Sequence, residues 1–171
     1  PSVTRTEKND FEVRMRPVEH PVIKGLPARW VHPGDVIIGG VPLSGENMVV
    51  LATASSDRRR GGSGIPEPVM LAKEEGQGRI FWTLLGTPDL EENKSLYCAG
   101  FIVTLQRGAE WAATGKVTQE VPFDFPTAAD AVLRSNYAMV TPDEAYTMLS
   151  AYDIGKSTLP YLWLQSEIRK A

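Results

Sequence analysis

The balance between strand-like and helix-like segments constrains the fold of this chain more than any single motif. Four segments have the composition of β-strands, whereas one long helix is predicted before residue 127. A parallel α/β sheet needs a helical crossover between successive strands, and this chain has too few helices to supply them. We therefore expect that sequence outside this chain, or another chain, completes the sheet.

The four predicted strands differ in their patterns. Residues 11–16 alternate apolar and charged side chains, which is typical of a half-buried strand. Residues 48–54 form a continuous apolar run, which favours an interior strand. Residues 69–73 and 79–85 are joined by a short Gly-containing segment, and this arrangement predicts a β-hairpin.

The remaining segments predict a loop, a helix and a separate tail. Residues 20–32 are rich in Pro and Gly and are predicted to form an ordered loop. Residues 97–114 have the length and composition of a helix, and Gly115 is a typical stop signal. We expect residues 1–126 to form one α/β domain and residues 127–171 a linker and a helical hairpin, because a capping box opens the first tail helix.

Composition indicates an ordinary globular chain and excludes several classes of protein. Apolar residues make up 42% and charged residues 23% of the chain, so it is neither disordered nor fibrous. A net charge of -3 gives no general attraction for nucleic acid, and no apolar run approaches the ~20 residues of a membrane span. The chain begins at Pro1 without an initiator Met, so we expect a processed or truncated polypeptide and leave its location open.

Six sequence blocks, taken in order, carry the most specific signal. They are residues 5–13, 20–30, 46–54, 67–69, 76–81 and 105–118. Together they resemble the C-terminal portion of the ThuA-like family, named after a trehalose-utilisation protein, with a fold similar to that of class I glutamine amidotransferases. The resemblance implies an incomplete half of a three-layer, flavodoxin- or amidotransferase-like α/β sheet. It also implies a link to carbohydrate utilisation.

Two departures from the family pattern, and the lack of an evident amidotransferase-type nucleophile, bear on function. Family members typically show a His followed by an Asp-Glu-aromatic group, whereas here His32 and Asp35 are followed by the apolar residues 36–38. Family members usually place a His behind the Gly after the last strand, where this chain has Thr87. An amidotransferase-type nucleophile belongs in a sharp strand-to-helix turn, whereas Cys98 lies at the start of a predicted helix. The sequence therefore predicts a degenerate site.

His32 and Asp35 are the candidate catalytic residues. A His and a carboxylate three residues apart on a loop could hold a metal, orient a general base or bind sugar hydroxyls. Two ligands do not make a metal site, and neither a metal nor another cofactor is expected. The alternative is a structural role, in which His32 is hydrogen-bonded to the backbone.

Four residues are candidates for substrate binding. They are Trp30, Arg107, Glu110 and Trp111, of which the last three could form the rim of a carbohydrate cleft with an aromatic face for stacking. In the alternative interpretation, Arg107 and Glu110 form an ion pair on the helix surface, and Trp111 is part of the core. The run 58–60 of three arginines could bind an anion or an acidic partner, or could be a solvated loop.

The sequence thus predicts a ThuA-like domain protein that is linked to carbohydrate utilisation and has a degenerate site. The expected partners are a carbohydrate or sugar derivative, and a protein or the missing N-terminal half, but not nucleic acid. The alternative is a non-catalytic interaction or scaffolding subunit of a larger complex that completes its sheet.

Overall fold

A computed structural model describes residues 3–42, 47–87 and 94–134. The chain divides into two compact units, Pro1–Arg134 and Ser135–Ala171, and only the first contains described residues. The predicted helical hairpin therefore lies outside the described residues. Within the described part, no helix is long and apolar enough to cross a membrane.

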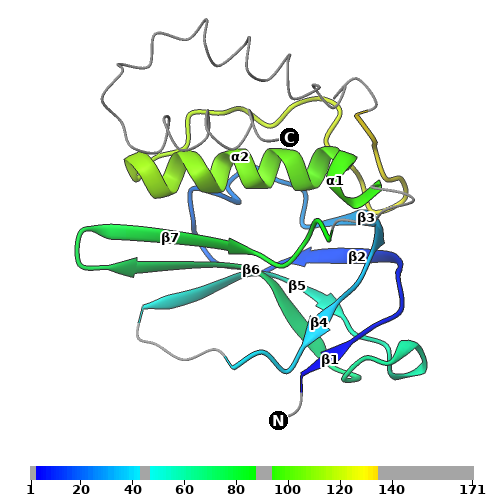
Figure 1. The fold of residues 1–171 in the computed structure, drawn as a ribbon. Coiled ribbons are helices and arrows are strands. Elements are labelled where there is room, and N and C mark those ends of the chain that lie inside the picture. Colours follow the sequence, from blue (N-terminus) through cyan, green and yellow to red (C-terminus); the bar gives the residue numbers. More distant parts are fainter. Residues whose placement is uncertain (1–2, 43–46, 88–93, 135–171) are drawn as a thin grey trace, which may run out of the picture. The chain divides into compact units, whose positions relative to one another are not determined.

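A curved antiparallel sheet is the main element of the first unit (Figure 1). Its strands lie in the order β3-β2-β5-β6-β7. Their bounds are Arg29–Asp35 for β3, Asn9–Met15 for β2, Met48–Ser55 for β5, Pro66–Glu75 for β6 and Gly78–Thr83 for β7. A second, two-stranded sheet pairs β1 with β4, Thr4–Arg5 with Ile38–Gly39.

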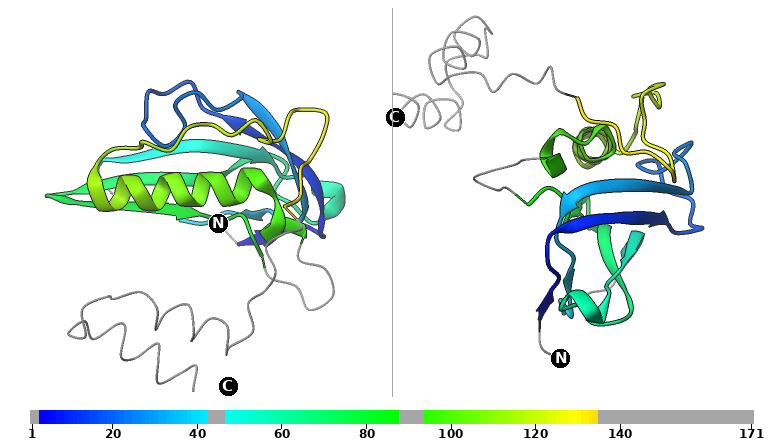
Figure 2. Two further views of the ribbon diagram at one scale, coloured as in Figure 1. Left: turned by 90° about the horizontal axis from the view of Figure 1, so that it is seen from above. Right: turned by 90° about the vertical axis from the view of Figure 1, so that its right-hand side faces the viewer.

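The helices of the described part are short except for one. They are the 3₁₀ turn η1 (Arg58–Arg60), α1 (Lys94–Tyr97) and α2 (Ala99–Thr114). In two directions of view, α2 runs across one face of the large sheet (Figures 1 and 2). The helix ends at Gly115, which adopts a left-handed conformation and bonds back to the Trp111 carbonyl, as the sequence predicts.

Antiparallel pairing explains how so many strands fold with so few helices. Successive antiparallel strands need no helical crossover, so the described part forms a sheet with α2 as its long helix. The fold class is mixed α/β, as predicted, and it is compatible with an incomplete amidotransferase-like domain. The apolar run of β5 is the central strand of the five, also as predicted.

One predicted element is wrong in part. Residues 20–32 are predicted as a loop, but β3 begins at Arg29 and continues to Asp35. The register with β2 explains the difference, because Val13 pairs with Trp30 and Phe11 pairs with His32. Pairing with β2 and burial of one face of β3 outweigh the local turn signals of Pro33 and Gly34.

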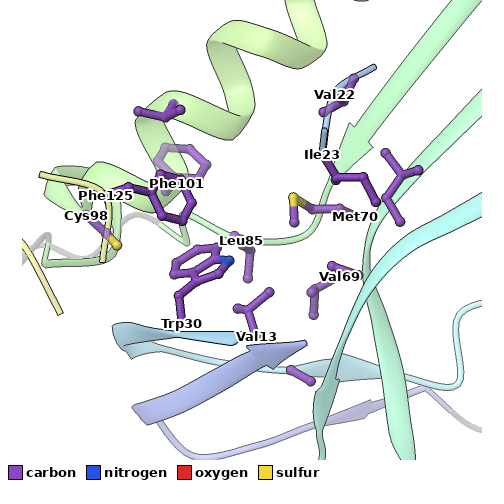
Figure 3. Packing of buried hydrophobic residues seen from close by; sticks show 14 of the residues in the cluster. Val13, Val22, Ile23, Trp30, Val69, Met70, Leu85, Cys98, Phe101 and Phe125 are labelled. Atoms are coloured by element: carbon purple, nitrogen blue, oxygen red, sulfur yellow. The ribbon is translucent and has the colours of Figure 1, made fainter. Parts of the chain in front are cut away.

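The hydrophobic core lies between the sheet and α2 (Figure 3). Trp30 extends from β3 toward the helix and meets the Phe125 ring edge-on, with 5.7 Å between ring centroids. Val13 and Met70 line the sheet side of the core, and Phe101 lines the helix side. The core thus fixes the end of β3, where His32 and Asp35 lie.

Close contact between α2 and β7 requires a residue without a side chain at position 108. A Cβ atom at Gly108 would lie 2.1 Å from the Phe81 ring. We expect Gly108→Ala to lower the free energy of unfolding by about 1–3 kcal/mol, because overpacking outweighs the gain in helix propensity. Urea denaturation checks this, and the added substitution Phe81→Leu should restore part of the loss. A stabilised Gly108→Ala variant would contradict the described packing.

Candidate functional site

A β-bulge at the end of β3 brings His32 and Asp35 to the same face. In a regular strand, residues three apart point to opposite faces. Here Phe11 pairs with His32 and Asn9 with Asp35, so two steps along β2 correspond to three along β3. Gly34 provides the extra step with a positive φ of 57°, a conformation that glycine adopts readily.

The carboxylate of Asp35 accepts four hydrogen bonds. Oδ2 accepts from His32 Nε2 at 2.8 Å and from the Gly86 amide at 2.7 Å. Oδ1 accepts from the Val36 amide at 2.8 Å and from the Thr87 amide at 3.3 Å. The side chain is fully buried, so Asp35 ties the end of β3 to the segment after β7.

The environment of Asp35 keeps its carboxyl group ionised. Burial alone would raise the pKa of Asp35, but hydrogen bonds and the charge interaction with His32 act in the opposite direction. Bonds from Thr87 and Gly86 add to this effect, and the pKa of Asp35 lies below its usual value. An ionised Asp35 accepts hydrogen bonds and does not donate, so the proton between the pair belongs to His32 Nε2.

His32 is enclosed by aromatic rings. Its ring centroid lies 5.4 Å from that of Phe11, 5.6 Å from Trp30 and 6.5 Å from Phe101. The side chain is fully buried, and Nδ1 has no hydrogen-bond partner within the described residues. Among the described residues, the His32 side chain therefore has one polar contact, to Asp35. A catalytic role for the pair stays a prediction.

A cavity of about 610 Å³ has Asp35, but not His32, in its wall. Four parts of the chain form its wall: residues 5–8, residues 34–36, residues 60–61 and Thr87. Such a volume falls within the range of small-molecule sites. Most of these residues were not predicted from sequence, because no motif links segments that lie so far apart in the chain.

Comparison with solved structures finds a similar protein. A crystal structure of a protein described as ThuA-like, from Parabacteroides merdae ATCC 43184, matches 78% of this chain at 42% sequence identity, with a TM-score of 0.72. This chain is ThuA-like in sequence and in fold. It spans 49% of that neighbour, about half of its length. No protein-family model matches the chain, and no curated protein matches it.

The four predicted substrate-binding residues of this ThuA-like chain lie outside the wall of the cavity. Trp30 is fully buried, and Trp111 is buried with its ring edge-on to His20. Glu110 accepts bonds from the amides of residues 118–119, which holds the segment after α2. Their roles in binding stay predictions.

Arg107 has the most extensive contacts of these four residues. Its guanidinium donates to the carbonyls of Val22 and Lys24 at 2.7 Å each, and to that of Pro21 at 3.0 Å. It also donates to the Gln119 carbonyl at 2.6 Å. Arg107 therefore joins α2 to two irregular segments of the ThuA-like fold. Burial lowers the pKa of Arg107, and Glu110 acts in the opposite direction.

Cys98 is fully buried and lies immediately before α2, at the start of a helix as the sequence predicts. Burial raises the pKa of Cys98 to about 11, so the thiol is protonated near neutral pH. Among the residues that the structure describes, no three His, Cys, Asp or Glu side chains lie close enough to hold a metal ion.

Proposed function

We propose that this ThuA-like chain binds a carbohydrate in the cavity beside Asp35 and that its catalytic site is degenerate. The observation that carries the proposal is the cavity of about 610 Å³, a volume that suits a mono- or disaccharide. Thr6, Glu7 and Thr87 contribute polar groups to its wall, and such groups can bond sugar hydroxyls. The ThuA-like family supplies the link to carbohydrates.

The contacts of the His-Asp pair support the degenerate site. A general base needs a free acceptor within hydrogen-bond reach of the substrate. Both oxygens of Asp35 already accept from two donors each, and His32 is enclosed by rings. In this proposal, Asp35 is a positioning residue that fixes the Gly86 and Thr87 amides beside the cavity.

Amide resonances of the full chain provide the test. We expect a panel of neutral and acidic mono- and disaccharides to include ligands that shift the amides of Gly34, Gly86 and Thr87 in NMR titrations. Ile80 and Trp82 lie in a separate groove and should not respond. Trp82→Ala is the matched control and should leave the titration unchanged. If no saccharide shifts the cavity amides, the proposed function is wrong.

A second candidate function rests on a different feature, an apolar groove of about 380 Å³. Val41, Pro42, Met48, Leu71, Lys73, Ile80, Trp82 and Leu84 line it. Phe81 packs toward α2, so its neighbours Ile80 and Trp82 point away from the helix, and they are 40% and 38% exposed. β7 is also an edge strand of the large sheet. These features favour the alternative of an interaction subunit whose sheet is completed by a protein partner.

Calorimetry with one defined polypeptide tests this alternative. The probe is the part of the Parabacteroides merdae ThuA-like protein that this chain does not match. Wild-type chain should bind it, and Trp82→Glu should abolish the binding because a carboxylate would be buried at the interface. Equal binding by both forms would show that the groove is not the interface.

A further inference from the structure

We infer that the cavity takes a sugar that carries an anionic group, a carboxylate or a phosphate; this inference rests on the proposed function. The cavity wall includes the basic residues Arg5, Lys8 and Arg60. The whole chain has a net charge of -3, so a cluster of three cations at one cavity is a local feature.

The acidic residues of the described cavity wall are Glu7 and Asp35. Lys8 has an interaction partner of its own, so the two arginines are the basis of the inference. Asp35 is fully buried and accepts four hydrogen bonds from inside the protein, so its charge is already satisfied. Glu7 is exposed, like Arg5 and Arg60. Among the described residues of the rim, the two exposed arginines therefore outnumber the one exposed carboxylate.

The structure holds the two arginines together by contacts of their backbones. The Glu7 amide donates to the Arg60 carbonyl at 2.7 Å. A Cβ atom at Gly61 would lie 3.0 Å from the Arg5 carbonyl, so the turn after η1 packs directly on β1. Asp57 caps this turn by accepting from the Arg59 amide at 2.9 Å. Residues far apart in the sequence thus share one rim.

Neither guanidinium is engaged inside the described part of the chain. Arg58 of the same turn donates to the Ser63 carbonyl, whereas no hydrogen bond or ion pair of the described residues involves the guanidinium of Arg5 or Arg60. Both arginines line the same cavity, so an anion bound there is attracted by two positive charges. Planar guanidinium groups match the two oxygens of a carboxylate or phosphate.

Calorimetric titrations of the full chain with gluconate, glucose 6-phosphate and glucose test the inference. We expect at least one anionic sugar to bind about tenfold or more tightly than glucose, with an affinity that falls as salt is added. Arg5→Gln and Arg60→Gln should each weaken that binding by about tenfold or more. Arg59→Gln is the matched control, because it removes the same charge from the same turn but does not border the cavity.

Each contrary result has a distinct meaning. If glucose binds as tightly as the anionic sugars, the inference is wrong and the proposed function stands. If Arg59→Gln weakens binding as much as Arg60→Gln, the loss of binding comes from the lower surface charge in general, and the inference is wrong. Inorganic phosphate that binds as tightly as glucose 6-phosphate would overturn the assignment to a sugar. If no sugar binds, both proposals fail. Unchanged urea midpoints for the variants exclude misfolding as the cause.

Discussion

Asp35→Asn is expected to lower the free energy of unfolding by about 3 kcal/mol, because an amide cannot replace a carboxylate that accepts four bonds. One oxygen becomes an NH₂ group, which then faces donors. Urea denaturation at neutral pH measures the loss. The Gly86 and Thr87 amides should also exchange faster with solvent, because they lose their acceptor.

The pH dependence of this loss follows from the lowered pKa of Asp35. A carboxyl whose pKa is lower in the folded state stabilises the fold above its unfolded pKa and loses that contribution as pH falls through the folded pKa. The difference between wild type and Asp35→Asn should therefore be constant well above pH 3.8 and narrow below it. A difference that grew on acidification would contradict the described hydrogen bonds.

Asp10→Asn is the matched control for Asp35. Its carboxylate accepts from the Gly34 amide at 2.7 Å in the same bulge, but the residue is exposed. The change in charge is the same, and the amide oxygen of Asn can still accept this bond. We expect a loss of at most about 0.5 kcal/mol. An equal loss in both variants would show that net charge, and not the buried network, determines the effect.

Arg107→Ala is expected to lower the free energy of unfolding by about 3–5 kcal/mol, because it removes four hydrogen bonds and leaves buried carbonyls without a donor. Arg107→Lys should cause a smaller but substantial loss, since one ammonium cannot reach four carbonyls. Urea denaturation measures both values.

Arg16→Ala provides the comparison for Arg107, because it removes the same side chain from an exposed position. We expect a change within about 0.5 kcal/mol. An Arg107→Ala variant as stable as Arg16→Ala would refute the role of Arg107 in joining α2 to the irregular segments. Such a result would leave binding as the remaining predicted role of Arg107.

Much of the sheet could be predicted from local sequence patterns. The alternation in β2, the apolar run of β5 and the hairpin of β6 and β7 each have a short-range signal, and the structure confirms them. β3 lacks such a signal because Pro33 and Gly34 indicate a turn. The conformation of β3 is decided by its pairing with β2, which cannot be predicted from the sequence of either segment alone.

The buried face of α2 was also hidden from pattern analysis. Its buried residues recur at helical spacing, but the stripe includes Gly100, Thr104, Arg107 and Gly108. None of these counts as strongly apolar, so the stripe does not stand out by hydrophobicity. Two of them permit close packing against Trp30 and Phe81, which is a property of the tertiary contact.

The candidate site could be predicted only in its centre. His32 and Asp35 stand out by residue type and spacing, and the structure joins them. The cavity wall could not be predicted, since residues 5–8 and 60–61 meet through backbone contacts such as that between Glu7 and Arg60. Sequence patterns do not encode contacts of this kind.

The bulge in β3 makes the site depend on the path of the backbone as well as on its polar residues. Gly34→Val would leave every polar side chain of the site in the sequence, but a β-branched residue disfavours the positive φ of 57° at this position and favours a regular strand. In a regular strand of the same length, Asp35 would point to the face opposite His32, and the segment at Gly86 would lose its anchor. A single substitution at a residue without any functional group could therefore dismantle this pair.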